Sequence, residues 1–281
     1  MRVFLPETTD ALWAHLCEEP EAALYAGGTD LLVKVRSGLV KPSALICLER
    51  LSEIRGVREE GEEIFIGACT THTALLESPV IEKHFPVLKK AVSVLGSPPI
   101  RHMATIGGNI CTASPAGDTL PPLYLLGAEL ELWAQAGTRR VALEQFISGP
   151  GRTAISGNEI LAGVRLKKGE EFNIHHFEKV GQRKALAISI ASLTALVRVT
   201  SSGIIEKIRL AWGSVGPTIV TSKEAEKALT GLPLTVESLR CAFPFINDAV
   251  SPISDIRASA AYRKAVSANL ALRLAQYGPR T

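Results

Sequence analysis

The sequence predicts an α+β fold built as two domains. In residues 1–172 short buried strands and helices follow one another, whereas residues 173–281 begin with three alternating strands and end with helices. Runs of strands followed by runs of helices are typical of α+β architecture. A chain of 281 residues is long enough to bury more than one hydrophobic core. We therefore expect a first domain over residues 1–172 and a smaller C-terminal domain over residues 173–281, with the boundary near residues 168–174.

The elements of the first domain follow from local patterns. Residues 8–17 favour a short helix, with Thr8, Thr9 or Asp10 as its N-cap. Apolar runs, capping residues and glycine terminators indicate the other elements. These are strands over 22–25, 45–48, 64–67, 128–133 and 160–166, helices over 31–36 and 86–95, a helix that begins at Ala74, and a helical turn over 123–126.

The stretch from residue 96 to residue 122 is expected to be irregular. It holds five prolines, which are Pro98, Pro99, Pro115, Pro121 and Pro122. Structureless segments of this length are uncommon in compact domains unless they serve a site. The stretch is therefore expected to be a binding loop.

The C-terminal domain is expected to contain a three-stranded antiparallel sheet with helices. Residues 174–180, 188–200 and 204–212 alternate between apolar and polar side chains, as strands do. Ser201, Ser202 and Gly203 provide a tight hairpin between the last two strands. Helices are predicted afterwards over 223–229, 236–242 and 258–274.

Composition excludes several classes of protein. The formal net charge is only +3 and no run of Lys or Arg occurs, which disfavours nucleic-acid binding. The five cysteines are widely spaced, with no CxxC motif and no His at metal-ligand spacing, so neither disulfides nor a metal site is predicted. The N-terminal stretch carries Asp10 and His15 and resembles neither a signal peptide nor a membrane span. We expect a cytoplasmic protein without a membrane span.

Two glycine pairs are the candidate functional motifs. Gly27 and Gly28 follow the strand over 22–25, and Gly107 and Gly108 lie within the long irregular stretch. Glycine permits positive φ and lets a ligand approach the backbone N–H groups closely. Each pair has a threonine beside it, Thr29 or Thr105. Two such loops could hold the two phosphates of a dinucleotide through backbone N–H groups and hydroxyls.

Six segments along the chain carry a family resemblance. They read AGGTDL at 26–31, ATIGGNICTASPAGD at 104–118, GNEILAGVRL at 157–166, FEKVGQRKALAIS at 177–189, GSVGPTIVTSKEAEKALTG at 213–231 and SDIRASAAYRKAVSANLALRL at 254–274. In this order they resemble the FAD-binding medium subunit of the molybdenum hydroxylases, the family of xanthine dehydrogenase and carbon monoxide dehydrogenase. Six matches in order are far more specific than one glycine motif.

The resemblance implies a fold and a cofactor, FAD. In that family FAD lies between two N-terminal subdomains of the vanillyl-alcohol oxidase type, here about 1–55 and 56–172, and a smaller C-terminal domain. By matched position the glycine loops hold the pyrophosphate, Asp118 reaches ribityl or ribose hydroxyls, and Leu161 and Lys179 flank the cofactor. The cofactor-binding residues implied in this way are Leu24, Tyr25, Ala26, Gly27, Gly28, Thr29, Asp30, Leu31, Thr105, Ile106, Gly107, Gly108, Asn109, Asp118, Leu161 and Lys179.

Two of the acidic positions carry alternatives. Asp30 stands at a helix start, where aspartate commonly caps the helix, so its backbone rather than its carboxylate is expected to face a phosphate. Asp118 suits sugar hydroxyls, and an ordinary turn aspartate is the alternative.

Leu95 stands where some members of the family place an aromatic residue beside the flavin, and a leucine can pack there but cannot stack.

The resemblance also implies a function as an oxidoreductase subunit. The chain would take electrons from the 2Fe-2S clusters of a small partner subunit, after a large partner with a molybdenum cofactor has oxidised the substrate. FAD would pass them to an acceptor such as NAD or a quinone, within a dimer of heterotrimers. No catalytic side chain is expected, because the cofactor carries the chemistry. A stand-alone flavin oxidoreductase and a non-enzymatic scaffold are the alternatives.

Overall fold

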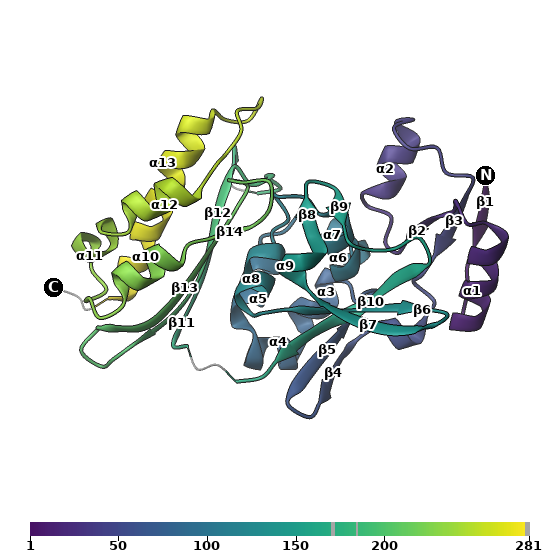
Figure 1. Cartoon of the computed structure of the whole chain (residues 1–281), viewed down its shortest axis with the longest axis horizontal. Helices are drawn as coiled ribbons and strands as arrows, with labels where there is room; N and C mark the ends of the chain where they lie inside the picture. The colour runs from purple at the N-terminus through teal and green to yellow at the C-terminus, as the bar shows by residue number, and fades with distance from the viewer. Residues whose placement is uncertain (170–171, 184, 279–281) are drawn as a thin grey trace. The chain divides into compact units, whose positions relative to one another are not determined.

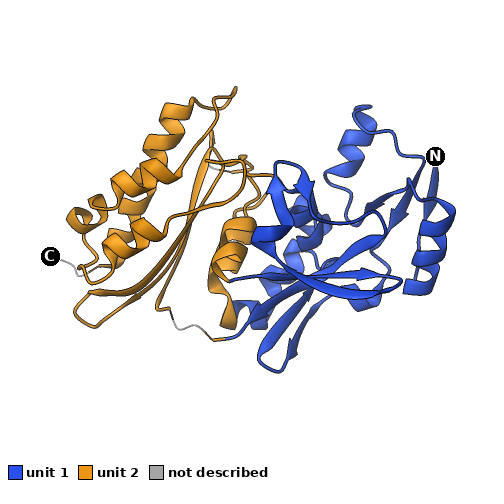
Figure 2. Ribbon diagram, in the orientation of Figure 1, with its two compact units in different colours: residues 1–83, 97–113, 127–168 blue, residues 84–96, 114–126, 169–281 orange. Residues whose placement is uncertain are grey.

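A computed structural model of the chain describes residues 1–169, 172–183 and 185–278 (Figure 1). It contains two compact units (Figure 2). Unit 1 comprises residues 1–83, 97–113 and 127–168, and unit 2 comprises residues 84–96, 114–126 and 169–281. Two segments of the predicted first domain are therefore grouped with the C-terminal part of the chain. The sequence domains 1–172 and 173–281 stay a prediction, and their residues 170, 171, 184 and 279–281 lie outside the described part.

Unit 1 contains a parallel sheet with the strand order β1-β3-β2. Helices occupy the connections, because parallel neighbours need a crossover between them. Thr8 caps the first helix by accepting a hydrogen bond from the Ala11 N–H group, which confirms the predicted capping segment. The elements are β1 (Arg2–Phe4), α1 (Thr9–Glu18), β2 (Ala23–Tyr25), α2 (Leu31–Arg36) and β3 (Ala44–Cys47).

Unit 1 also contains an antiparallel sheet with the order β4-β5-β10-β6-β7. Its strands are β4 (Val57–Glu60), β5 (Glu63–Gly67), β6 (Glu129–Ala134), β7 (Gly137–Ala142) and β10 (Glu159–Lys167). The register between β10 and β6 shifts between Leu161 and Gly163, which marks a β-bulge. Shorter elements complete this part: η1 (Ser52–Ile54), α3 (His72–Glu77), α4 (Pro79–His84), α9 (Leu143–Phe146), β8 (Ile147–Gly149) and β9 (Arg152–Thr153).

The expectation of an irregular stretch over 96–122 is wrong. The structure places three short helices in or across it: α6 (Pro98–Met103), α7 (Ile106–Thr112) and α8 (Leu120–Leu125). Four of the five prolines, all except Pro115, lie in the first turns of α6 and α8, where the missing N–H group has no intrahelical partner to lose. Ser97 and Thr105 cap α6 and α7 with their side-chain oxygens. Proline therefore marks helix starts here.

Unit 2 is built on an antiparallel sheet with the order β11-β12-β13-β14. The three predicted strands are confirmed, and the two-residue β14 extends the sheet. Gly203 makes the predicted hairpin with a φ of +80°. The elements are α5 (Pro86–Ser93), β11 (Ile174–Val180), β12 (Ala191–Val199), β13 (Ile205–Gly213), β14 (Val220–Thr221), α10 (Lys223–Leu229), α11 (Val236–Arg240), α12 (Phe243–Ala249), α13 (Ala260–Ala271) and η2 (Leu272–Tyr277).

Helices cover both faces of the sheet in unit 2. Helices α10 and α13 pack on β13 and β12, while α5 and α8 pack on β11, β12 and β13. Figure 1 shows α10, α12 and α13 along one side of the sheet. Trp212 of β13 is fully buried on this side, and its indole N–H donates to the Ser267 carbonyl of α13 at 3.0 Å. Within the described residues, no helix is long and apolar enough to span a bilayer.

Candidate functional site

The two glycine pairs lie close together in unit 1. Gly27 follows β2, and a Cβ atom added to it would lie 1.6 Å from the backbone oxygen of Met103 at the end of α6. Only glycine therefore lets the first loop approach the segment that leads into the second loop. Gly28 has a φ of +68°, a left-handed conformation that glycine adopts without strain. The backbone itself requires both glycines of the first loop.

The first loop presents unpaired backbone donors. Within the described part of the chain, the N–H groups of Gly27, Gly28 and Thr29 donate to no other group. The chain then enters α2, beginning with the bond from the Leu32 N–H group to the Gly28 carbonyl at 3.1 Å. Successive N–H groups in a turn make a concavity that suits an anion.

The second loop uses most of its N–H groups to hold itself in place. The N–H groups of Ile106 and Gly107 donate to the carbonyls of Thr70 and Ala68, at 3.0 and 2.9 Å. The Gly108 N–H group donates to Thr105 Oγ1 at 3.1 Å, which caps α7. The second loop is therefore a fixed wall, and the first loop is the better candidate for binding phosphate through N–H groups.

The two glycines of the second loop differ in their surroundings. A Cβ atom on Gly107 would lie 2.5 Å from the Cβ atom of Ala68, so this glycine is needed for packing. A Cβ atom on Gly108 would have only Thr105 Oγ1 nearby, at 3.1 Å. Gly108 is also exposed. Space in front of Gly108 is thus open to a ligand, whereas Gly107 serves the fold.

A cavity of about 340 Å³ joins the loops within unit 1. Most of its lining comes from three segments: the end of β2, the second glycine loop with α7, and residues 153–161. The residues that line it are Leu24, Tyr25, Ala26, Leu48, Ala68, Cys69, Thr105, Gly107, Gly108, Cys111, Thr153, Ile155, Ser156, Gly157, Glu159, Ile160 and Leu161.

The lining of this cavity is almost uncharged. Burial, together with the Cys47 thiol, raises the pKa of the Tyr25 phenol to about 12. Burial raises the pKa of the Cys69 thiol to about 12 as well. Both groups are neutral at physiological pH. Among the described residues that line the cavity, Glu159 carries the only carboxylate and there is no Lys or Arg. An anion in this cavity would therefore depend on backbone and hydroxyl donors.

Asp30 does not cap α2, contrary to the expectation from its position. It occupies the N-cap position, but its side chain makes no capping hydrogen bond. Its Oδ2 atom instead accepts from Lys34 Nζ at 2.6 Å and from Thr112 Oγ1 at 3.2 Å. The carboxylate thereby links the first loop to the end of α7.

Asp118 and Lys179 form an ion pair in unit 2. The Lys179 Nζ atom lies 2.5 Å from Asp118 Oδ2, and the two side chains are 11% and 8% exposed. Burial raises the pKa of Asp118 to about 6, although Lys179 opposes the shift. The Oδ1 atom of Asp118 is buried and has no hydrogen-bond partner in the described residues. A buried acceptor without a protein partner is able to accept a hydrogen bond from water or from a ligand hydroxyl.

The structure brings only some of the predicted residues to one place. Leu24, Tyr25, Ala26, Thr105, Gly107, Gly108 and Leu161 line the cavity of unit 1. Gly27 and Gly28 shape its first loop, and Asp118 pairs with Lys179 in unit 2. The described residues that line the cavity do not include Thr29, Asp30, Leu31 or Asn109, and Ile106 is fully buried in α7.

Most of one side of the cavity is not predicted from the sequence. In the wall over residues 153–161 only Leu161 is among the expected cofactor-binding residues, and Ala68 and Cys69 carry no signal in the sequence. A Ser156-Gly157 turn immediately before the strand was the available clue, because serine and glycine mark turns.

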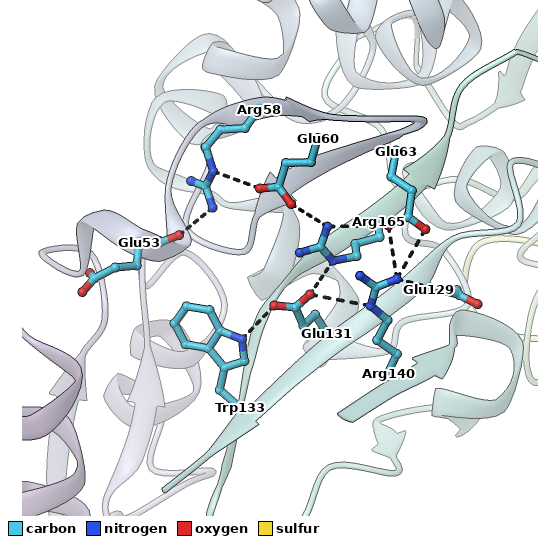
Figure 3. A network of polar contacts seen from close by, with 9 residues as sticks. All are labelled: Glu53, Arg58, Glu60, Glu63, Glu129, Glu131, Trp133, Arg140 and Arg165. Carbon is cyan, nitrogen blue, oxygen red and sulfur yellow. Dashed lines mark hydrogen bonds and ion pairs between the residues drawn. The ribbon is translucent and has the colours of Figure 1, made fainter. Parts of the chain in front are cut away.

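A second polar cluster lies on the five-stranded sheet of unit 1 (Figure 3). Arg165 pairs with Glu131, and its Nη1 atom lies 2.7 Å from Glu60 Oε2. The guanidinium groups of Arg58 and Arg165 lie 4.5 and 4.8 Å from the centre of the Phe65 ring. The hydrogen bond from Arg165 lowers the pKa of Glu60. These charges are paired with one another, so the cluster stabilises the sheet.

Comparison with known proteins identifies a family for both parts of the chain. Residues 1–166 match the family described as the FAD binding domain in molybdopterin dehydrogenase, and residues 176–277 match the CO dehydrogenase flavoprotein C-terminal domain. The chain is 34% identical to the nicotinate dehydrogenase FAD-subunit of Eubacterium barkeri over 93% of this chain and 90% of that protein. It is 32% identical to the putative xanthine dehydrogenase FAD-binding subunit of Escherichia coli K12, over 88% of this chain and 85% of that protein.

A solved structure has the same fold. Carbon monoxide dehydrogenase from Hydrogenophaga pseudoflava matches with a TM-score of 0.90 and 29% identity, over 97% of this chain and 95% of that chain.

Proposed function

Because the chain belongs to the family of FAD-binding subunits of the molybdenum hydroxylases, we propose that it is the electron-transfer subunit of such an enzyme. In this proposal it takes electrons from the 2Fe-2S clusters of a small partner subunit. A large partner subunit carries the molybdenum cofactor and oxidises the substrate. The chain then delivers the electrons to an external acceptor such as NAD or a quinone. FAD, when bound, supplies the redox chemistry, and the protein binds and orients it.

The free N–H groups of Gly27, Gly28 and Thr29 carry this proposal. They lie in a loop beside the cavity, and Gly108, which has open space in front of it, also lines that cavity. A pyrophosphate bound here would receive backbone hydrogen bonds, each worth about 1.5–3 kcal/mol to a charged acceptor. The Thr105 oxygen already accepts from Gly108, and its O–H group is left to donate to a phosphate oxygen. The residues present therefore fit a dinucleotide without a lysine or an arginine.

Further cofactor contacts follow from the cavity and from unit 2. Leu24, Tyr25, Ala26 and Leu161 offer a largely apolar lining for the parts of FAD beside the pyrophosphate. Asp118 offers its unpaired Oδ1 atom to a ribityl or ribose hydroxyl, and Lys179 holds the other oxygen. The remaining proposed contacts to FAD come from residues beside or within the two glycine pairs, through their backbone: Thr29, Asp30, Leu31, Ile106, Gly107 and Asn109.

The proposed assembly is a cytoplasmic dimer of heterotrimers. Support for an assembly comes from the relatives, since the matched proteins are named as FAD subunits or medium chains. The expected absence of a catalytic side chain fits a subunit that only transfers electrons.

Isolation of the chain from its native host tests the assignment. A tagged chain should co-purify with a larger and a smaller subunit, and the preparation should contain molybdenum and iron as well as FAD. A chain that carries FAD but is isolated alone, without either metal, would contradict the subunit role and favour a stand-alone flavin oxidoreductase.

A further inference from the structure

One wall of the cavity in unit 1 has no regular structure of its own. It runs from Thr153, at the end of β9, through residues 154–158 to Glu159, at the start of β10. Backbone hydrogen bonds fix it at only a few points, from Ala154 N–H to the Phe146 carbonyl at 2.8 Å and from Glu159 N–H to the Ser156 carbonyl at 3.0 Å. Side chains must therefore determine the shape of this wall.

Arg139 of β7 makes the side-chain contacts that hold the wall. Its Nε atom lies 2.6 Å from Glu159 Oε1, and its Nη2 atom lies 2.8 Å from Glu159 Oε2. The same Nη2 atom donates to the Ala154 carbonyl at 2.9 Å. Glu159 Oε2 also accepts from the Ser156 N–H group at 2.9 Å. One guanidinium group thus joins both ends of the 154–159 segment through a two-pronged pair, which is the most directional form of ion pair.

The pair also controls a charge on the cavity wall. The hydrogen bonds from Arg139, with that from Ser156, lower the pKa of Glu159 to about 2. Glu159 is therefore ionised throughout the physiological range, and its side chain is only 10% exposed. It is the one carboxylate among the described residues lining the cavity. Without Arg139, this charge would face an incoming diphosphate with no cation beside it.

Arg140 provides a natural control for Arg139. In the register between β6 and β7, Arg139 pairs with Leu132 and Arg140 pairs with Glu131. Neighbouring residues of a strand project to opposite faces. Arg140 accordingly contacts Glu63 and lies near Glu129 and Glu131 (Figure 3). The two arginines share a strand, a charge and 44% side-chain exposure, but they serve opposite faces of the sheet.

We propose that Arg139 is a positioning residue for the cofactor, which sets the shape of the cavity wall over residues 153–161 through Glu159 and the Ala154 carbonyl. This inference rests on the proposed function, because it takes FAD as the ligand of the cavity. Preorganisation of a binding wall reduces the ordering cost of binding, so its loss lowers affinity without removing a direct contact.

The test compares three variants of the full chain with the wild type in equilibrium titrations of the FAD-free protein with FAD. Arg139→Met should weaken FAD binding by about tenfold or more. Arg139→Lys keeps the positive charge but loses the paired hydrogen bonds of the guanidinium group to Glu159. It should therefore also bind FAD more weakly than the wild type. Arg140→Met should bind FAD as the wild type does. Thermal unfolding of each FAD-free variant shows whether a loss of affinity is separate from a loss of stability.

The double variant Arg139→Met with Glu159→Gln separates shape from charge. If Arg139 positions the wall, removal of the Glu159 charge leaves FAD binding weak. Recovery of wild-type affinity in the double variant would overturn the proposal and leave charge compensation as the role of Arg139. Equal affinities of Arg139→Met and the wild type would overturn it as well. Failure of the wild type to bind FAD would instead contradict the proposed function.

Discussion

The carboxylate of Asp118 lies 2.5 Å from the Nζ atom of Lys179, although the two residues are 61 positions apart in the sequence. Lys179 binds one carboxylate oxygen, and the other is buried without a partner in the described residues. Burial still raises the pKa of Asp118 to about 6. The pair therefore presents an oriented acceptor whose charge depends on pH near neutrality.

The affinity for FAD should depend on the ionisation of Asp118. Above pH about 6 the ionised carboxylate accepts hydrogen bonds from sugar hydroxyls, and below that pH protonation weakens this acceptor. We expect the FAD affinity of the wild type to fall as the pH decreases through this range. Asp118→Asn should bind more weakly at neutral pH and lack this part of the pH dependence. Fluorescence titrations at a series of pH values measure both, and identical profiles would contradict the role of Asp118.

Gly27→Ala should damage the fold around the loops as well as FAD binding. The added Cβ atom would meet the Met103 backbone oxygen at 1.6 Å, and backbone cannot move aside as a flexible side chain can. Overpacking of this kind costs about 1–3 kcal/mol or more of unfolding free energy. Urea unfolding of the FAD-free protein measures the loss. Gly149→Ala is the matched control, because its Cβ atom would meet only a side-chain carbon at 3.9 Å.

Gly108→Val should abolish FAD binding and leave the protein folded. The position is exposed, and the only atom near an added Cβ is Thr105 Oγ1 at 3.1 Å. Valine is no worse than glycine in a helix, so the helical propensity of α7 is not reduced. The melting temperature of the FAD-free variant should stay near that of the wild type, while bound flavin is lost. Retention of stoichiometric FAD would exclude a phosphate in front of Gly108.

His72 should make the second loop sensitive to acid. Its side chain is fully buried, and neither ring nitrogen has a partner in the described residues. The backbone N–H group of His72 donates to the Ala104 carbonyl, just before the second loop. Burial, assisted by Arg101, lowers the pKa of His72 from 6.5 to about 4. Between these two pKa values, His72 binds a proton more tightly in the unfolded chain than in the folded chain, so the folded protein loses stability as the pH falls.

Replacement of His72 by leucine tests the predicted direction of this pH dependence of stability. The shift corresponds to about 3 kcal/mol of unfolding free energy at full protonation. Relative to the wild type, His72→Leu should gain stability as the pH is lowered from 6.5 to 4. Urea unfolding at several pH values measures the difference. A difference that does not vary with pH would show that His72 is not the group that titrates.

The local features of the site could be predicted from the sequence. The glycine pairs and the capping threonine Thr105 are recognised from spacing alone, because turn and cap chemistry depends on neighbouring residues. Helices and strands with apolar periodicity, such as β12 and α10, were predicted with ends close to those observed. The strands β4 and β7 were missed, since their side chains are largely polar and exposed at the sheet edges.

The remaining features depend on distant contacts. The Asp118–Lys179 pair and the Arg139–Glu159 pair join residues 61 and 20 positions apart, and no local pattern encodes such pairing. The prolines over 96–122 favour a loop when the sequence is considered alone, whereas four of them lie in the first turns of α6 and α8, a position that suits proline in a helix. Grouping of residues 84–96 and 114–126 with unit 2 depends on packing against β11, β12 and β13.

The flavin content of the purified chain tests the central claim most directly. We expect a visible flavin spectrum after incubation with FAD and desalting, with close to one FAD per chain released by acid denaturation. Flavin that stays with the denatured protein would indicate covalent attachment and favour a stand-alone oxidase. No bound flavin, even with the partner subunits co-expressed, would contradict the account and leave the glycine loops as structural turns.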